Sequence, residues 1–131
     1  MPNLPRILIV DDNLDHRLIL THQLARFGTF EIVEAEDGQQ ALAIITATSP
    51  DLIFMNLGLP VLDGWEAIRQ IRALPAPLGQ TPIIVFTAYA GGQQEQGARQ
   101  AGCDEYLTKP LLDVGLLQRT VTSLLGRGRR P

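Results

Sequence analysis

The chain has 131 residues, of which 45% are hydrophobic and 19% are charged, and its formal net charge is −3. This length suffices for one compact domain whose core needs no metal or disulfide. The mild negative charge argues against non-specific binding to nucleic acid. No segment is long and apolar enough to cross a membrane, and the start of the chain lacks the apolar stretch of a signal peptide.

The single cysteine, Cys103, cannot form a disulfide within the chain. Since no cluster of histidine and cysteine surrounds it either, this predicts a reducing, cytoplasmic setting. Cys103 precedes a short apolar segment, which favours a small buried thiol over a reactive one.

The first predicted strand covers residues 7–10, and a helix follows it. Asn13 is a favoured N-cap residue for this helix, and Gly28 suits its C-terminal end. The helix carries one apolar face, formed by Leu20, Leu24 and Phe27.

The second strand is predicted at residues 32–33. The second helix opens at Asp37 and ends near Ser49, because Pro50 disfavours helical structure in the residue before it. The third strand is predicted at residues 52–55, a continuously apolar segment.

Asp63 can cap the third helix, which closes around residues 74–75. The fourth strand is predicted at residues 83–86, and an unusually polar helix follows at about residues 93–101. A weaker fifth strand is predicted at residues 106–107. The fifth helix has one apolar stripe, consisting of Val114, Leu117, Val121 and Leu124.

Strand and helix alternate five times, which predicts an α/β fold with helices on both faces of a sheet. Three strands, at residues 7–10, 52–55 and 83–86, are continuously apolar. Strands of this kind are buried on both faces and belong to parallel sheets. Since crossovers between parallel strands are right-handed, a doubly wound layout is the natural arrangement.

No internal repeat or linker divides the chain, so we expect residues 1–131 to form one domain with a core at about 6–125. The last helix is expected to end before Gly126. Residues 126–131, which include Arg127, are expected to form a short, flexible, basic tail.

Polar side chains follow the predicted strands at the points where the strands end. In a doubly wound sheet, binding sites lie at the carboxyl ends of the strands. Acids, a hydroxyl and a lysine from four separated segments should therefore meet at one edge, and this convergence is the main functional feature of the sequence. The residues concerned are Asp11, Asp12, residues 56–60, Thr87, Ala88, Thr108, Lys109 and Pro110.

Asp11 and Asp12 are adjacent carboxylates, which suit a hard cation such as Mg²⁺; alternatively, one of them only caps the next helix. Lys109 can pair with these acids or contact a phosphoryl oxygen, or it is an ordinary surface lysine. The hydroxyl of Thr87 can donate a hydrogen bond to an oxyanion, or Thr87 is an ordinary threonine at a strand end. Tyr106 is either an aromatic reporter on the last strand or a half-buried edge residue.

Four segments occur in an informative order: ILIVDDN, PDLIFMNLGLPVLDGWEAIRQIR, PIIVFTA and AGCDEYLTKP. In this order they resemble the response-regulator receiver family of two-component signalling, over about residues 6–125. The resemblance implies a flavodoxin-like, doubly wound (βα)5 fold whose five-stranded parallel sheet has the order 2-1-3-4-5. It also implies transfer of a phosphoryl group from a histidine kinase to an aspartate, with Mg²⁺ as the cofactor.

The resemblance assigns the metal-binding positions to Asp11, Asp12, Asn56 and the carbonyl of Gly58, with Asp12 as the direct carboxylate ligand. Asn56 also takes the phospho-acceptor position of the family.

The remaining functional positions of the family fall on three residues. Thr87 takes the hydroxyl position and Lys109 the lysine position beside the phosphoryl group. Thr87 and Tyr106 take the two positions of the family's switch.

Asn56 departs from the family pattern, because an amide has no anionic oxygen to act as a nucleophile. Ordinary aspartyl phosphorylation is therefore not expected, and Mg²⁺ binding should be weakened. Asp51 cannot replace Asn56, since it lies at the other end of the third strand, ~16 Å away at the rise of a strand. Three explanations stay open: a naturally degenerate receiver, a deliberate replacement of the acceptor, or a structural Asn56 with another residue modified.

The resemblance implies a signalling module rather than an enzyme. Its expected partners are a sensor histidine kinase or phosphotransfer protein, and a downstream protein that contacts the fourth helix, the fifth strand and the fifth helix. A homodimer is a further option, and no direct contact with nucleic acid or membrane is expected.

Two other classes of function compete with this interpretation. A Mg²⁺-dependent phosphohydrolase of the haloacid-dehalogenase type would need a second acid two residues after Asp11, where Asn13 stands. A flavodoxin-type cofactor carrier would need hydroxyls and backbone amides in the first loop to bind a flavin phosphate, and here that loop is acidic.

Overall fold

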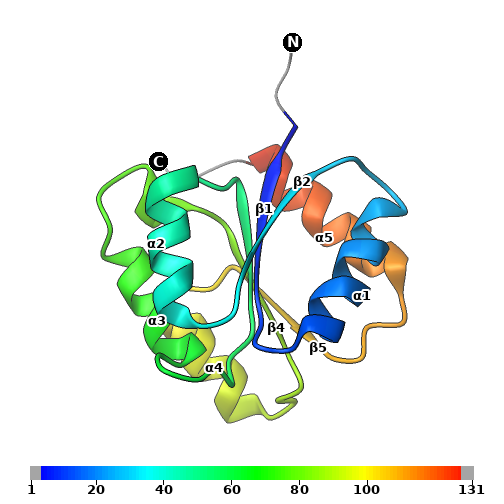
Figure 1. Cartoon of the computed structure of the whole chain (residues 1–131). Helices are drawn as coiled ribbons and strands as arrows, with labels where there is room; N and C mark the ends of the chain where they lie inside the picture. The colour runs from blue at the N-terminus through cyan, green and yellow to red at the C-terminus, as the bar shows by residue number, and fades with distance from the viewer. Residues whose placement is uncertain (1–3, 128–131) are drawn as a thin grey trace.

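The computed structural model describes residues 4–127 and places five strands in one parallel sheet. The strand order is β2-β1-β3-β4-β5, as the family resemblance implied (Figure 1). The strands are β1 (Arg6–Val10), β2 (Glu31–Ala35), β3 (Leu52–Met55), β4 (Ile83–Thr87) and β5 (Glu105–Thr108).

The three continuously apolar strands, β1, β3 and β4, occupy the middle of the sheet. Every residue of β3 and β4 is buried, whereas the edge strands β2 and β5 mix buried and exposed positions. Ile7 of β1, for example, lies opposite Ile32 of β2 on one side and opposite Leu52 of β3 on the other. Apolar side chains on both faces of the central strands thus account for the parallel sheet.

Three helices begin at the N-cap residues that the sequence predicts. The side chains of Asn13, Asp37 and Asp63 each accept a hydrogen bond from the backbone amide three residues further on. These bonds satisfy amides that have no partner inside the helix. The helices are α1 (Leu14–Ala25), α2 (Gly38–Thr48), α3 (Gly64–Arg72), α4 (Gly92–Ala101) and α5 (Val114–Arg127), with a short 3₁₀ helix, η1 (Leu78–Gln80).

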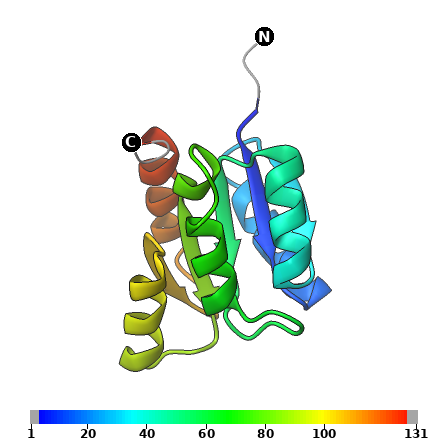
Figure 2. The same cartoon turned by 90° about the vertical axis from the view of Figure 1, so that its left-hand side faces the viewer.

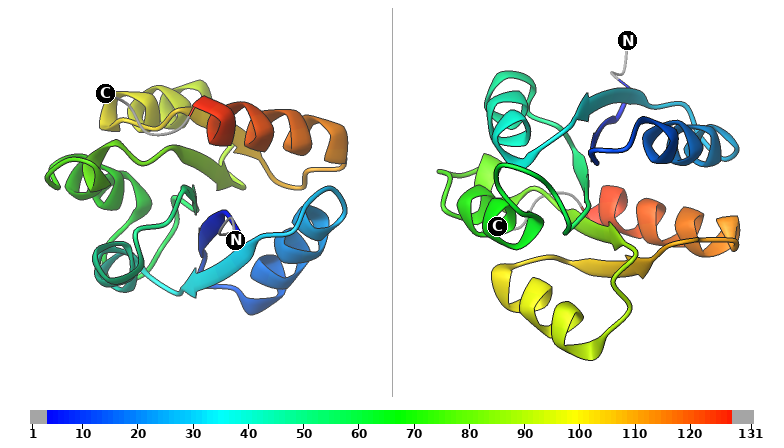
Figure 3. Two further views of the ribbon diagram at one scale, coloured as in Figure 1. Left: turned by 90° about the horizontal axis from the view of Figure 1, so that it is seen from above. Right: turned by 60° about the horizontal axis from the view of Figure 1, so that its bottom comes forward.

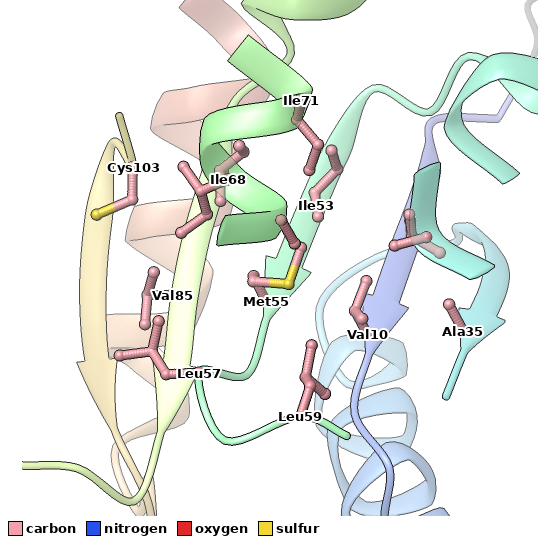
Figure 4. Close-up of a cluster of buried hydrophobic side chains, with 14 of the residues drawn as sticks. Val10, Ala35, Ile53, Met55, Leu57, Leu59, Ile68, Ile71, Val85 and Cys103 are labelled. Atoms are coloured by element: carbon pink, nitrogen blue, oxygen red, sulfur yellow. The ribbon is translucent and has the colours of Figure 1, made fainter. Parts of the chain in front are cut away.

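The helices cover both faces of the sheet, and each face has its own apolar core. Helices α1 and α5 pack on one face, and α2, α3 and α4 lie on the other (Figures 2 and 3). On the latter face, Ile68 and Ile71 of α3 lie over the strands beside Ile53 and Met55 (Figure 4). The predicted doubly wound α/β fold is therefore confirmed.

Cys103 belongs to the core under α3 and α4 and is only 6% exposed. Burial raises the pKa of its thiol to about 11. The side chain is therefore a protonated, buried thiol, as predicted. Within residues 4–127, no helix combines the length and apolar character that a membrane span requires.

The first helix ends earlier than predicted. Helix α1 stops at Ala25, because the amides of Arg26 and Phe27 bond to carbonyls three residues back and tighten the last turn. Gly28 instead accommodates the ring of Phe30, which would lie 2.6 Å from a Cβ atom at this position.

The last helix is longer than predicted, since α5 continues through Gly126 to Arg127. The guanidinium of Arg127 lies 3.1 Å from the carboxylate of Asp104, so this residue is not part of a free tail. Residues 128–131 of the expected tail lie outside the described residues.

The sequence did not predict η1, which lies between α3 and β4. Arg72 of α3 holds this segment, because its guanidinium donates to the carbonyl of Gly79 at 3.0 Å and to that of Thr81 at 2.6 Å. It also pairs with Asp104, which is buried before β5. A single arginine thus joins two connections of the chain, the one between α3 and β4 and the one between α4 and β5.

The loop between β3 and α3 contains a strained residue. Val61 has a φ of 67°, and the amide of Leu62 bonds to the carbonyl of Pro60 at 2.7 Å, which closes a tight turn around it. Positive φ is unfavourable for a β-branched side chain. Val61 is 75% exposed, so little packing energy offsets this cost.

We predict that Val61→Asn raises the free energy of unfolding by about 1 kcal/mol, because asparagine tolerates positive φ better than valine does. Urea unfolding of the two proteins measures the difference. Val61→Thr is the matched control, since it keeps the β-branched side chain and should change stability by less than about 0.5 kcal/mol. Equal stability of the asparagine and threonine variants would contradict the strain argument.

Candidate functional site

A cavity of about 290 Å³ opens at the carboxyl ends of the strands, at the edge turned forward in the right-hand view of Figure 3. Residues from the loops after β1, β3, β4 and β5 meet there, so the convergence that the sequence predicts is confirmed. The lining residues are Asp11, Asp12, Asn13, His16, Asn56, Gly58, Thr87, Ala88, Tyr89 and Lys109.

Backbone hydrogen bonds just beyond the strands fix the positions of three lining residues. The amide of Asp11 donates to the carbonyl of Ala35, and that of Asn56 donates to the carbonyl of Val10. The amide of Lys109 donates to the carbonyl of Thr87 at 2.8 Å. The sheet ladder therefore continues into the loops and holds these residues beside one another.

Asp11 and Lys109 form an ion pair at the base of the cavity, with Lys109 Nζ 2.5 Å from Asp11 Oδ2. The other carboxylate oxygen, Oδ1, accepts a hydrogen bond from the amide of Asn13 at 2.9 Å. Only 6% of the Asp11 side chain and 14% of the Lys109 side chain are exposed. Lys109 is therefore not an ordinary surface lysine.

The two adjacent acids, Asp11 and Asp12, differ in their surroundings. Asp11 is buried, whereas Asp12 is exposed at the rim of the cavity. Neither caps α1, because Asn13 does so through its own side chain. The alternative that one of the acids merely caps the next helix is therefore wrong.

Asn56 and Thr87 complete the floor of the cavity. Asn56 directly follows β3 and is half-buried. Thr87 is the last residue of β4 and is almost fully buried, and its hydroxyl accepts a long hydrogen bond, 3.5 Å, from the amide of Tyr89. Asp51 lies before β3, where its carboxylate accepts from the amide of Arg6 at 2.8 Å. It is thus at the opposite edge of the sheet, as predicted.

Tyr106 reaches the site only indirectly. It is a half-buried residue of the edge strand β5, and burial raises the pKa of its phenol. Its hydroxyl donates to the backbone carbonyl of Tyr89 at 2.5 Å, and Tyr89 lines the cavity.

Two residues of α1 that the sequence did not predict to be part of the site support the ion pair. His16 Nδ1 lies 3.1 Å from Lys109 Nζ and 3.7 Å from Asp11 Oδ2. The guanidinium of Arg17 donates to the carbonyl of Asp11 at 2.6 Å and pairs with Glu34 at 2.9 Å. In the sequence, the one indication that His16 faces the end of β1 was its position three residues after the N-cap Asn13.

The cavity offers the type of donor that Mg²⁺ prefers. Two carboxylates, the amide oxygen of Asn56 and the carbonyl of Gly58 belong to residues that line it, and all are hard oxygen donors. Within residues 4–127, no cluster of three or more histidine, cysteine, aspartate or glutamate side chains is arranged to hold a metal. The donors thus fit Mg²⁺ by their chemical type, with one carboxylate fewer than an aspartate at position 56 would provide.

We predict that Lys109→Met lowers the free energy of unfolding by about 1–3 kcal/mol, because it leaves the buried Asp11 carboxylate without its cation. Chemical denaturation measures this loss. Adding Asp11→Asn to the same chain should recover at least half of it, since the amide carries no charge. A neutral effect of Lys109→Met would show that the ion pair does not stabilise the fold.

Comparisons with known proteins agree with this geometry. The model of the response regulator receiver domain family matches residues 7–121. The transcriptional regulatory protein PrrA of Mycobacterium leprae is 36% identical over 124 residues, which are 95% of this chain and 52% of that protein. The chain thus spans about half the length of this curated relative.

Solved structures are similar over nearly their whole length. A putative response regulator from Chloroflexus aurantiacus superposes with a TM-score of 0.87 at 29% identity, covering 95% of this chain and all of that one. The receiver domain of the sensor histidine kinase PA1611 from Pseudomonas aeruginosa, with a magnesium ion coordinated in its active site cleft, has a TM-score of 0.84 at 34% identity. This similarity covers 95% of this chain and 99% of that one. The sequence, the fold and the site together show that the chain belongs to the response regulator receiver domain family.

Proposed function

We propose that this receiver domain signals through protein–protein contacts and does not accept a phosphoryl group at position 56. The observation that carries the proposal is the place of Asn56, which follows β3 in the cavity that also contains Asp12, Thr87 and Lys109. The family resemblance assigns the phospho-acceptor to this position. An amide nitrogen is delocalised and its oxygen carries no charge, so Asn56 lacks the nucleophile that the reaction needs.

The other residues keep the roles that the resemblance assigns to them. Lys109 would supply a positive charge beside a phosphoryl oxygen, and Thr87 a hydroxyl donor. Thr87 and Tyr106 would form the switch, and both contact Tyr89 in the loop after β4. These contacts support a structural connection from the cavity through Tyr89 to the edge strand β5.

Bound Mg²⁺ would supply positive charge that balances the acids of the cavity. The residues that would hold it are Asp11, Asp12, Asn56 and Gly58. With Asn56, the two aspartates and Lys109 give a net charge of about −1, whereas an aspartate at position 56 would give about −2. The chain as it stands should therefore attract the ion less strongly.

The comparisons give no support to the phosphohydrolase of the haloacid-dehalogenase type, since the family model that matches is that of the response regulator receiver domain. The family match likewise favours a receiver over a flavodoxin-type carrier. We therefore propose that the chain is a cytoplasmic binding module without enzymatic activity or direct contact with nucleic acid.

Two faces suit protein partners. The face formed by α4, β5 and α5 is the one expected to contact a downstream protein or a second copy of the chain. Next to the cavity, a groove of about 400 Å³ exposes Ile19 of α1 and Leu112 before α5. This groove shares His16, Ala88 and Lys109 with the cavity. A sensor kinase or phosphotransfer protein that binds over the cavity would therefore also cover the groove.

We predict that Asn56→Asp lowers the metal-free stability by about 1–2 kcal/mol, because it adds a like charge to a partly buried site. The variant should then gain stability as Mg²⁺ is added, since an ion bound only by the folded form shifts the equilibrium by mass action. Paired thermal melts across a Mg²⁺ titration at fixed ionic strength measure both effects. If the unaltered chain gained stability as steeply as the variant, Asn56 would be a working metal ligand and the charge argument would be wrong.

A further inference from the structure

Trp65 and Tyr89 form a stacked aromatic pair beside the cavity. Their ring centroids are 5.9 Å apart and their planes differ by 13°. Trp65, the only tryptophan of the chain, belongs to α3, and Tyr89 follows β4 two residues after Thr87. The pair therefore joins α3 to the loop that enters α4.

Tyr89 contacts the cavity as well as the indole. It lines the cavity, and its hydroxyl would lie only 2.9 Å from a Cβ atom at Gly58, so the phenol rests against the backbone after β3. Its own backbone carbonyl accepts the hydroxyl of Tyr106 at 2.5 Å. Tyr89 is thus held by the contact with the backbone after β3, by the hydrogen bond from β5 and by the stack with Trp65.

Trp65 contacts α4 on its other side. Its indole nitrogen donates to the carbonyl of Gln94 at 3.4 Å. Gly97, one turn further along α4, allows this close approach, because a Cβ atom there would lie 3.3 Å from the same nitrogen. The indole therefore lies between the loop after β4 and the first two turns of α4.

Helix α4 has few other anchors. Its N-cap is Gly91, which provides no capping side chain, and Ala98 is its one buried residue. By contrast, α1, α2 and α3 each begin with a side-chain cap and bury at least three residues. The N-terminal half of α4 therefore depends strongly on contacts from outside the helix.

We propose that Trp65 and Tyr89 are positioning residues whose stack fixes the loop after β4 and the first half of α4, and thereby links the cavity to this helix. A change at Gly58, such as an ion at its carbonyl, would move the Tyr89 hydroxyl, then the indole, then α4. That last step rests on the proposed function, because it assumes that Gly58 contributes to an ion site and that α4 belongs to a partner face.

Hydrogen exchange tests the structural part of this proposal in the full chain. Tyr89→Ala removes the stack and should speed exchange of the amides of residues 95–97, the first that bond within the helix, by about tenfold or more, with exchange in β1, β3 and β4 unchanged. Tyr89→Phe keeps the stack and loses only the hydroxyl, so these amides should stay within about twofold of the unaltered chain. The emission of Trp65 should shift in the alanine variant and not in the phenylalanine variant.

Two results would overturn the proposal. One is unchanged exchange in α4 of the alanine variant, and the other is equally fast exchange in the alanine and phenylalanine variants. Both substitutions should leave the fold intact, because Tyr89 is 44% exposed.

A Mg²⁺ titration of Asn56→Asp tests the link to the cavity, with binding measured by calorimetry and the response by Trp65 fluorescence. The fluorescence should follow the calorimetric binding curve, and adding Tyr89→Ala should abolish the fluorescence change while Mg²⁺ still binds. Binding without a fluorescence change would overturn the link. Absence of binding would instead contradict the proposed ion site, and the exchange experiment would still decide the role of the stack.

Discussion

The ion pair between Asp11 and Lys109 is the interaction on which the site depends. A buried carboxylate is costly without a cation nearby, and here the cation arrives from a residue 98 positions away in sequence. Asp11 follows β1 and Lys109 follows β5, and the parallel sheet places the carboxyl ends of both strands at the same edge. Arg17, which donates to the carbonyl of Asp11, and the amide of Lys109, bonded to the carbonyl of Thr87, hold both ends in place. The fold and the charge arrangement therefore support each other.

On the proposed function, position 56 is where the chemistry of the cavity differs from the family pattern. Asn56 occupies its place at the end of β3 through its backbone, which bonds to Val10 whatever side chain it carries. Shape and backbone are thus compatible with either an amide or a carboxylate. The difference lies in charge and nucleophilicity, so the same scaffold would either bind partners alone or also take part in phosphoryl transfer.

The sequence predicted those features that local chemistry controls. Continuous apolar segments gave the three central strands, and Asn13, Asp37 and Asp63 gave the helix starts, because a capping side chain acts within its own turn. The site could be located since strand ends in a doubly wound sheet share one edge. Features that depend on distant partners could not be predicted. The extension of α5 to Arg127 needs Asp104, η1 needs Arg72, and the contacts of His16, Trp65 and Tyr89 require three-dimensional neighbours.

The most direct test of this account is phosphoryl labelling of position 56. The unaltered chain and its Asn56→Asp variant are incubated with Mg²⁺ and a small acyl or amido phosphate donor, and the intact masses are compared. We expect no added phosphoryl group on the unaltered chain and one on the variant, since Asp12, Thr87 and Lys109 remain in place. Robust, acid-stable labelling of the unaltered chain would contradict the account, because the chain would then accept a phosphoryl group although it has no aspartate at position 56.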